Sequence, residues 1–148
     1  MNRKEIIEEI KKYFKISELV CDHTAAKFGD KAWRFLDTEY LHALLILRRD
    51  VIRLPMQCNY GKLKQRGLRC NCCKIVKEQK SVYLSAHCLG KAGDFSIVGM
   101  AAEAARERVK ICADLFPCKV RVEGGVNWLH FDVLDMGEGY PKVYEFKA

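Results

Sequence analysis

The order of the elements that the sequence predicts places this chain in the α+β class. Helical patterns fill most of the first half of the chain, and short strand patterns separated by turn residues fill most of the second half. Chains with this order commonly fold into an antiparallel sheet packed against helices. We therefore expect a small antiparallel sheet, two longer helices and an N-terminal helix. Because 148 residues is a usual size for one domain, residues 1–148 are assigned to a single domain.

Helical spacing of apolar residues identifies the first elements. Residues 2–14 predict an amphipathic helix, and residues 17–20 predict a short turn after it. Residues 30–51 carry a longer apolar stripe and predict the first long helix, with Asp30 as a suitable N-cap. The alanine-rich residues 99–115 predict the second long helix.

Strand patterns follow a basic, irregular connection over residues 55–74. Two of them flank the turn residues Gly124 and Gly125, which indicates a β-hairpin. The predicted strands, in chain order, are residues 82–84, 92–98, 120–122, 128–134 and 143–146.

The net charge of +7 limits the partners without identifying one. Lysine and arginine are scattered along the chain, and no basic-aromatic motif typical of nucleic-acid binding stands out. We therefore do not expect a nucleic-acid partner. A basic surface also suits an anionic polymer such as a cell wall, or affects solubility alone. No apolar run approaches the ~20 residues that span a bilayer, so membrane insertion is not expected.

Eight cysteines are many for a chain in which we find no secretory signal peptide. In a reducing cytosol they are expected to be thiols or metal ligands rather than disulfides. Cys70 and Cys73 have the C-x-x-C spacing of a zinc site, and Cys58 is a third candidate. Because a second C-x-x-C pair is missing, we favour buried, inert thiols over a structural zinc site.

Two short segments contain the candidate ligands of a catalytic zinc ion. Residues 85–94 read S-A-H-C-L-G-K-A-G-D and contain His87 and Asp94. Residues 128–132 read W-L-H-F-D and contain His130. Two imidazoles and one carboxylate leave the fourth position of a tetrahedral zinc ion open, which is typical of catalytic zinc sites.

Asp132 shares a strand face with His130, because alternate residues of a strand point the same way. Its carboxylate is therefore expected to accept the second N–H of a ligand histidine and to fix the tautomer of that ring. The alternative for each histidine is an ordinary packed side chain. For His42, in the first long helix, we adopt the alternative of a surface or hydrogen-bonded histidine.

The same two segments resemble the metal motifs of the zinc D-alanyl-D-alanine carboxypeptidase family. Residues 85–94 fit the pattern S-x-H-x-x-G-x-A-x-D at every fixed position, and residues 129–132 resemble a motif of a hydrophobic residue, His, a hydrophobic residue and Asp. Residues 16–21 resemble the opening of one bacterial and phage branch. The family includes vancomycin-resistance D,D-dipeptidases and phage L-alanyl-D-glutamate endolysins, and it shares its fold with the hedgehog signalling domain. The resemblance covers residues 16–134.

This resemblance implies a hedgehog-like fold and a bound Zn²⁺ ion. By it, His87, Asp94 and His130 are the metal ligands. Ser85 matches the motif serine, which is expected to support the ligand loop by hydrogen bonding, and its alternative role is that of a turn residue. Asp132 is expected to support a ligand rather than to bind the metal.

The resemblance also suggests catalytic residues, with one departure. Residues 67–70 resemble the Gly-Tyr-Arg segment of the family, whose arginine faces the substrate and stabilises the oxyanion. Arg69 is our choice for this role, with Arg66 as its competitor and a solvated loop arginine as the alternative. Several members carry an acidic general base three residues before the last ligand histidine, where this chain has Asn127. Glu123, across the predicted turn, is our choice of base, and its alternative is an exposed strand-end glutamate.

These features predict a zinc-dependent hydrolase that cleaves peptide bonds in peptidoglycan stem peptides, as a D,D-carboxypeptidase, an endopeptidase or a phage-type lysin. We expect a monomer that is made in the cytoplasm and reaches the cell wall by release or export; release with a holin is suggested by analogy with lytic relatives. A catalytically silent, hedgehog-like zinc-binding module is the alternative, and Asn127 favours it. A basic nucleic-acid binder ranks last, because it gives no reason for the motif in residues 85–94.

Overall fold

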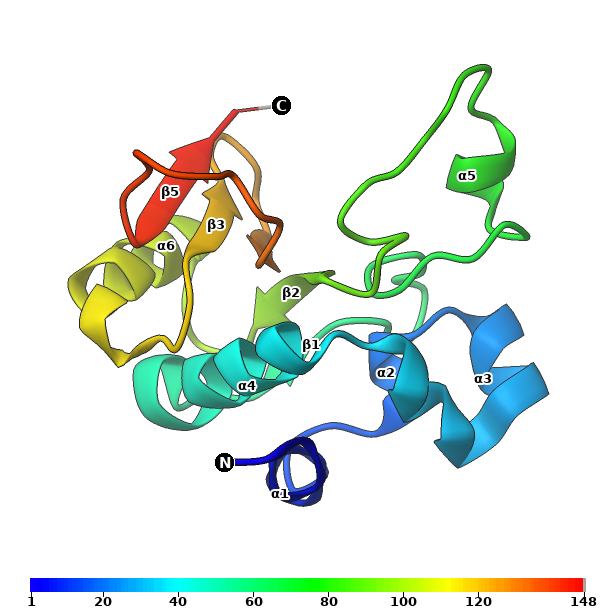
Figure 1. Ribbon diagram of the computed structural model, residues 1–148, viewed down its shortest axis with the longest axis horizontal. Helices are drawn as coiled ribbons and strands as arrows, with labels where there is room; N and C mark the ends of the chain where they lie inside the picture. Colours follow the sequence, from blue (N-terminus) through cyan, green and yellow to red (C-terminus); the bar gives the residue numbers. More distant parts are fainter. Residues whose placement is uncertain (148) are drawn as a thin grey trace.

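The structure, a computed structural model, describes residues 1–147 and confirms the α+β class (Figure 1). The strands are β1 (Met56–Gln57), β2 (Ala92–Ile97), β3 (Val120–Glu123), β4 (Leu129–Asp132) and β5 (Val143–Phe146). The α-helices are α1 (Arg3–Ile10), α2 (Ile16–Leu19), α3 (Asp22–Phe28), α4 (Thr38–Ile46), α5 (Lys74–Lys77) and α6 (Ala102–Ile111). Within residues 1–147, no helix combines the length and the apolar character needed to cross a membrane.

The five strands form one mixed sheet with the order β1-β2-β4-β3-β5. The predicted hairpin is confirmed, because β3 and β4 pair in antiparallel fashion on either side of the Gly124–Gly125 turn. The expectation of a purely antiparallel sheet is wrong, because β5 pairs with β3 in parallel. The chain reverses once after β4 and passes to the far side of β3, so β5 must run in the same direction as β3.

The predicted strand over residues 82–84 is also wrong, since this segment is irregular. Val82 and Leu84 are 87% and 69% exposed, so no packed face holds the segment in a sheet. Tyr83, between them, instead uses its hydroxyl to accept a hydrogen bond from Arg69, at 3.1 Å.

The first long helix is interrupted where the sequence predicts continuity. Residues 29–35 form a 3₁₀ turn, α4 begins only at Thr38, and a π-helical turn continues it over residues 47–52. Asp37, not Asp30, is the N-cap of α4, and its carboxylate accepts a hydrogen bond from the backbone N–H of Tyr40 at 3.0 Å. Both halves of the segment bury apolar residues, so hydrophobic spacing alone does not reveal the break between them.

The other helical predictions differ mainly at their ends. α1 is shorter than residues 2–14, beginning with a capping box between Asn2 and Glu5. α2 confirms the short turn predicted at residues 17–20. α6 is shorter than residues 99–115, because Ala101 has extended backbone angles and a 3₁₀ turn over residues 113–115 follows the helix.

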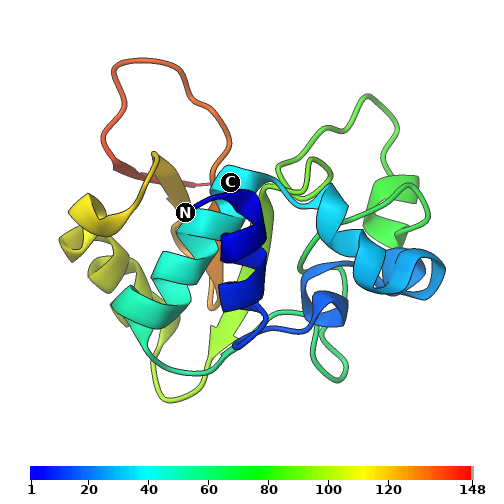
Figure 2. The same ribbon diagram turned by 60° about the horizontal axis from the view of Figure 1, so that its bottom comes forward.

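One face of the sheet forms the hydrophobic core. Phe95 packs against Phe14 and Phe131 against Phe116, with ring centroids 6.0 and 5.6 Å apart. Apolar residues of α4 and α6 belong to the same buried cluster, and α1 lies alongside α4 (Figure 2). The helices thus cover this face, while the other face of the sheet is turned toward the segment that carries α5 (Figure 1).

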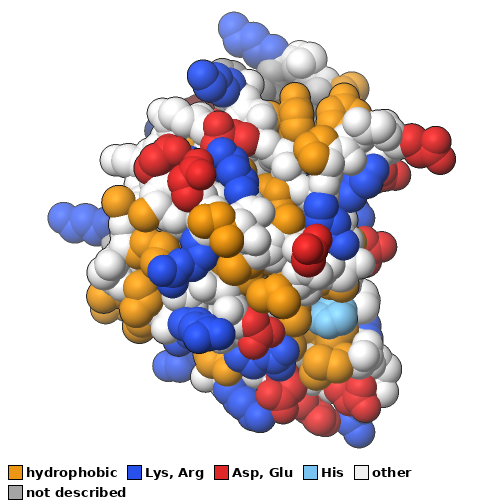
Figure 3. Space-filling model, turned by 90° about the vertical axis from the view of Figure 1, so that its left-hand side faces the viewer, with side chains coloured by type: hydrophobic (Ala, Val, Ile, Leu, Met, Phe, Trp, Pro, Cys, Tyr) orange, Lys and Arg blue, Asp and Glu red, His pale blue; other side chains and the backbone are white. Residues whose placement is uncertain are grey.

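The outer surface shows no gathering of one charge on the side seen in Figure 3. Basic side chains are interspersed there with acidic and hydrophobic ones. The scattered charge of the sequence is therefore also scattered in space on this side of the molecule.

Candidate metal centre

The register of the sheet brings functional side chains together on the face opposite the core. Asp94 on β2 is paired with His130 on β4, and Arg121 on β3 is paired with Asp132 on β4. Paired residues share a face, as do alternate residues along a strand. The side chains of five residues of the candidate site therefore project from this face, namely Asp94, His130, Asp132, Arg121 and Glu123.

The turn over residues 86–90 brings His87 to the same place. This turn fits into the break between the 3₁₀ segment and α4, because Gly90 approaches Phe35 so closely that a Cβ atom on Gly90 would lie 2.1 Å from the Phe35 carbonyl oxygen. Gly90 also has φ +70°, which L side chains rarely adopt. The backbone N–H of Asp37 donates to the Gly90 carbonyl at 3.0 Å and fixes the contact.

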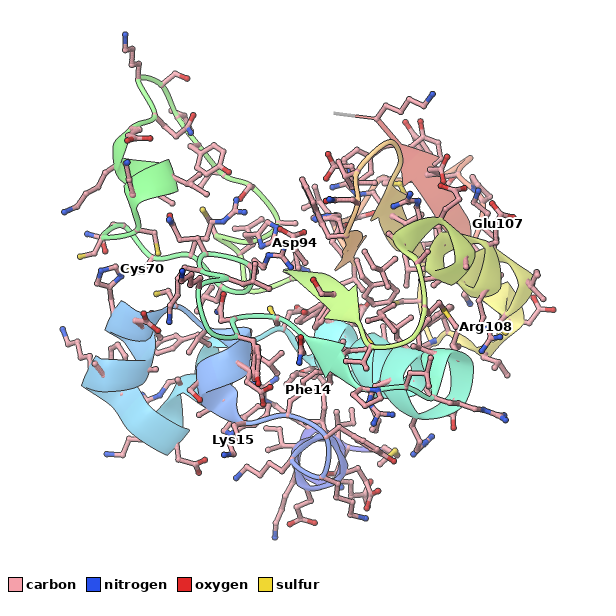
Figure 4. The ribbon with its side chains drawn as sticks, turned by 180° about the vertical axis from the view of Figure 1, so that it is seen from behind. Phe14, Lys15, Cys70, Asp94, Glu107 and Arg108 are labelled. Carbon is pink, nitrogen blue, oxygen red and sulfur yellow. The ribbon has the colours of Figure 1, made fainter. Side chains whose placement is uncertain are left out.

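Three predicted ligands meet at one point. One ligand atom from each of His87, Asp94 and His130 lies within 4.8 Å of the others, and all three side chains are buried. His130 Nδ1 is 2.7 Å from Asp94 Oδ1, and His87 Nε2 is 3.4 Å from Asp94 Oδ2. Asp94 lies near the middle of the molecule, in the first half of β2 (Figure 4). This arrangement is able to hold a metal ion.

The remaining nitrogen of each histidine is held by the protein. His87 Nδ1 donates to the Gly67 carbonyl at 2.9 Å, and His130 Nε2 donates to Asp132 Oδ2 at 2.6 Å. Such partners fix the tautomer and orientation of a ligand histidine. His87 Nε2 and His130 Nδ1 are thereby the two nitrogens directed at Asp94.

Asp132 is itself fixed by several partners. Its side chain is fully buried and accepts two hydrogen bonds from Arg121, at 2.8 and 2.9 Å. The backbone N–H of Leu134 donates to it at 3.0 Å. Asp132 therefore acts on the site through His130, as the sequence predicts.

Without a metal ion, protons occupy the contacts of His130 with Asp94 and Asp132. Burial opposes charge on His130, but its hydrogen bonds to Asp132 and Asp94 outweigh burial and raise its pKa to about 9. Burial likewise disfavours the Asp94 carboxylate, yet hydrogen bonds from His130 and His87 hold the pKa of Asp94 well below its usual range. The site is thus a cationic imidazole between two carboxylates, and a metal ion must displace a proton to bind there.

A cavity of about 350 Å³ opens over the three candidate ligands. Glu123 lies in its wall, and no hydrogen bond or ion pair of the Glu123 carboxylate is found within residues 1–147. Trp128, Leu134 and Phe146 supply apolar wall. Asn127 is exposed and does not line this cavity.

The two candidate arginines differ in position. Arg69 lines the cavity, with Nη2 3.7 Å from Asp94 Oδ2 and a side chain only 12% exposed. Hydrogen bonds to the Gln65 carbonyl and the Tyr83 hydroxyl hold the guanidinium. Arg66 instead donates to Ser96 Oγ at 3.0 Å and is not in the cavity wall.

The other predicted residues have local roles. Ser85 supports the ligand turn, because its carbonyl accepts from the backbone N–H groups of Cys88 and Leu89, and its hydroxyl lies 3.4 Å from the Cys88 nitrogen. His42 is part of α4 and belongs to neither group of possible metal ligands found in residues 1–147.

Sequence reasoning missed three residues that hold the site in place: Gly67, Tyr83 and Arg121. Gly67 acts through a backbone carbonyl, which no side-chain pattern reveals. Arg121 was detectable, because a residue on a hairpin strand opposite Asp132 has a predictable partner once the turn is placed. Tyr83 accepts a hydrogen bond from Arg69 but lies in an irregular segment, where no sequence pattern indicates this role.

The favoured prediction of buried, inert thiols agrees with the position of Cys58 but not with that of Cys72, which is exposed. Cys58 does not join Cys70 and Cys73, but is fully buried in the core. Burial raises the pKa of the Cys58 thiol above its ordinary value, as expected of an inert thiol. Two other residues, Cys21 and His23, lie beside Cys70 and Cys73 instead.

Comparison with protein-family models, with curated proteins and with solved structures gives no match to this chain.

Proposed function

We propose that the chain is a zinc-dependent hydrolase that cleaves a peptide bond in peptidoglycan stem peptides. The single observation that supports this most strongly is the meeting of His87 Nε2, His130 Nδ1 and the Asp94 carboxylate under an open cavity. The motif resemblance of residues 85–94 and 129–132 suggests the reaction and the substrate class.

The residues at the centre fit a zinc ion. Zinc prefers nitrogen and oxygen ligands at ~2.0–2.2 Å, and two imidazoles with one carboxylate form a usual three-ligand set. Both histidines have a second nitrogen that is already hydrogen-bonded, which is typical of zinc-binding histidines. Zinc bound there would supply Lewis-acid activation of a water molecule and of the substrate carbonyl.

Two side chains of the cavity wall suit the remaining steps of hydrolysis. Glu123 has a carboxylate with no other partner in the described residues, so it can accept a proton from the attacking water and deliver it to the leaving amine nitrogen as the C–N bond breaks. Arg69 places a fixed positive charge beside Asp94, where it can stabilise the oxyanion that develops from the carbonyl.

The cavities are large enough for a short peptide. A second cavity, of about 500 Å³, shares Arg69 and Tyr83 with the first. Its wall is mainly apolar and includes Phe28, Phe35 and Leu89. A stem peptide extending through both would pass directly over Arg69.

A catalytically silent zinc-binding module is the second candidate. Asn127 favours it, because an amide at this position cannot exchange a proton and the side chain is exposed. The two candidates differ on one point, which is whether Glu123 supplies the missing carboxylate.

Digestion of purified peptidoglycan tests the proposal. Zinc-loaded protein is incubated with sacculi, and the soluble fragments are identified by mass spectrometry. We expect fragments that differ from the intact stem peptides by hydrolysis of one peptide bond, with release stopped by a chelator and restored by zinc. His87→Ala should lose this activity and His42→Ala should retain it, with circular dichroism showing that both variants are folded.

Two results would contradict the proposal that the chain is a hydrolase. One is hydrolysis by His87→Ala at the wild-type rate. The other is tight zinc binding with no cleavage of any stem peptide, which supports the silent module.

A further inference from the structure

A second group of metal-ligating side chains lies away from the cavity over His87. One ligand atom from each of Cys21, His23, Cys70 and Cys73 lies within 4.8 Å of the others. Cys70 Sγ is 3.7 Å and Cys73 Sγ 3.9 Å from His23 Nδ1. Figure 4 shows Cys70 beside α3, where the segment leading to α5 meets the helical half of the molecule.

These separations are close to those that a tetrahedral ion imposes on its ligand atoms. Zinc with bonds of ~2.3 Å to sulfur and ~2.0–2.1 Å to nitrogen sets neighbouring ligand atoms roughly 3.6–3.8 Å apart. Three cysteines and one histidine are also one of the usual ligand sets of closed, structural zinc sites. Cys21 and Cys73 are buried, and the ligand atoms nevertheless converge on one point.

We propose that Cys21, His23, Cys70 and Cys73 bind a structural zinc ion. The missing second pair of ligands is Cys-x-His at residues 21–23 rather than another C-x-x-C. This site is independent of the hydrolase proposed above, because none of its four ligands belongs to the His87 group.

The surroundings suit three thiolates around a divalent cation. The backbone N–H of Cys72 lies 3.3 Å from Cys70 Sγ, and Cys21 Sγ is 3.1 Å from Thr24 Oγ1. Such contacts orient and stabilise metal-bound sulfur. Lys64 and Lys74 line the adjoining cavity of about 250 Å³ together with Asp22, which pairs with Lys64 at 3.2 Å.

The backbone brings the two ligand pairs together without metal ligation. Val20 and Leu68 form a parallel β-bridge, and the N–H of Cys21 donates to the Leu68 carbonyl at 3.0 Å. Gly67 permits the contact, since a Cβ atom there would lie 2.2 Å from the Leu19 carbonyl oxygen. A preformed backbone contact of this kind lowers the entropy cost of assembling the four ligands.

The structural zinc ion would also stabilise the position of the residues around His87. The segment from Gly67 to Cys70 ends in one ligand of the structural ion, and the Gly67 carbonyl holds His87 Nδ1. The N–H of Arg69 donates to the His87 carbonyl at 3.2 Å. The ion would therefore restrain the backbone segment that orients His87 and Arg69.

Cobalt substitution tests this site without reference to activity. Reduced protein is stripped of metal, and Co²⁺ is added in two equivalents under anaerobic conditions. We expect the strong near-ultraviolet absorption of thiolate-to-cobalt charge transfer in the wild type and in His87→Ala, since the His87 group contains no sulfur. Cys70→Ser should weaken or lose this absorption. Cys72→Ser is the matched control and should retain it, because its exposed sulfur lies outside the group.

Zinc content gives a second readout. We expect two zinc ions per wild-type and Cys72→Ser chain, and one per His87→Ala and Cys70→Ser chain. If Cys70→Ser fails to fold, the cobalt absorption and zinc content of the wild type and of His87→Ala still test whether the cysteine group binds metal. Wild-type protein that binds no thiolate-ligated cobalt, or whose cysteines form a disulfide under reducing conditions in place of binding metal, would overturn the proposal.

Discussion

At the scale of single residues, Asp132 shows how a buried carboxylate serves a site without binding the metal. Its two oxygens accept from His130, from Arg121 and from a backbone N–H. His130 therefore presents Nδ1, and only Nδ1, toward Asp94. A side chain with this role is expected to affect metal affinity more than it affects the shape of the cavity.

Replacing Asp132→Asn should lower zinc affinity at the His87 group by roughly 10–100-fold, which is the usual effect of losing a hydrogen-bond partner of a ligand histidine. The affinity is measured by competition with a chromophoric chelator. Asp114→Asn is the control, because Asp114 is exposed and distant from both metal groups in sequence. Equal zinc affinity of the Asp132→Asn protein and the wild type would show that this contact does not orient the ligand.

Glu123→Gln should separate catalysis from metal binding. An amide keeps the size of the side chain but cannot take the proton of the attacking water, so the rate of stem-peptide hydrolysis should fall by about 10²–10⁴-fold. Zinc content should stay at the wild-type value. The exposed Glu138→Gln variant is the control and should hydrolyse normally. Wild-type rates in Glu123→Gln would assign the general base to another group.

At the scale of elements, four of the five strands were predictable from the sequence, whereas β1 and the irregular form of residues 82–84 were not. β2 and the β3–β4 hairpin follow from alternation and turn residues that lie within the segments themselves. The pairing of Asp94 with His130 is a further consequence, since both fall on these strands. The selection of His87, which lies in a turn before β2, depended instead on the motif resemblance of residues 85–94.

The break before α4 was not predictable, because its cause is distant in the sequence. The gap between Phe35 and Thr38 receives the turn around Gly90, more than fifty positions later in the chain. For the same reason, the sequence did not predict that Cys21 and His23 lie beside Cys70. Each depends on a contact between segments whose own patterns carry no sign of it.

Gly90→Ala tests whether this contact positions His87. The new Cβ would meet the Phe35 carbonyl oxygen at 2.1 Å, in addition to the cost of a left-handed backbone. Gly137→Ala shares the positive φ but has open space around the added atom, so it isolates the backbone cost. We expect Gly90→Ala to lower the free energy of unfolding by at least about 2 kcal/mol more than Gly137→Ala, measured in urea. Zinc affinity at the His87 group should fall only in Gly90→Ala. Equal losses of stability in the two variants would show that the contact between Gly90 and Phe35 does not position His87.

At the scale of the whole molecule, the metal-free centre makes stability depend on pH. The pKa of His130 in the folded protein, about 9, exceeds its ordinary value of 6.5. Its protonated form therefore stabilises the fold fully below pH 6.5, and this contribution is lost as the pH rises through about 9. The Cys21 thiol has the opposite effect on stability, because hydrogen bonds with Thr24, His23 and Cys70 together outweigh burial and lower its pKa to about 6.

The contribution of His130 to stability is measured as the difference in free energy of unfolding between the wild type and His130→Asn. In chelator-treated protein, the free energy of unfolding of the wild type should exceed that of His130→Asn most strongly near pH 6, and the gap should narrow toward pH 9. The Cys21 effect is common to both proteins and cancels. A gap that is constant or widens with pH would mean that His130 is not held as a cation between Asp94 and Asp132.

The central claim is that one divalent ion binds between His87, Asp94 and His130. Anomalous X-ray diffraction at the zinc absorption edge, from crystals of zinc-loaded protein, tests it most directly. We expect a peak ~2.0–2.2 Å from His87 Nε2, His130 Nδ1 and an Asp94 carboxylate oxygen. The absence of a peak among these three side chains at saturating zinc, whatever is found at the cysteine group, would contradict it.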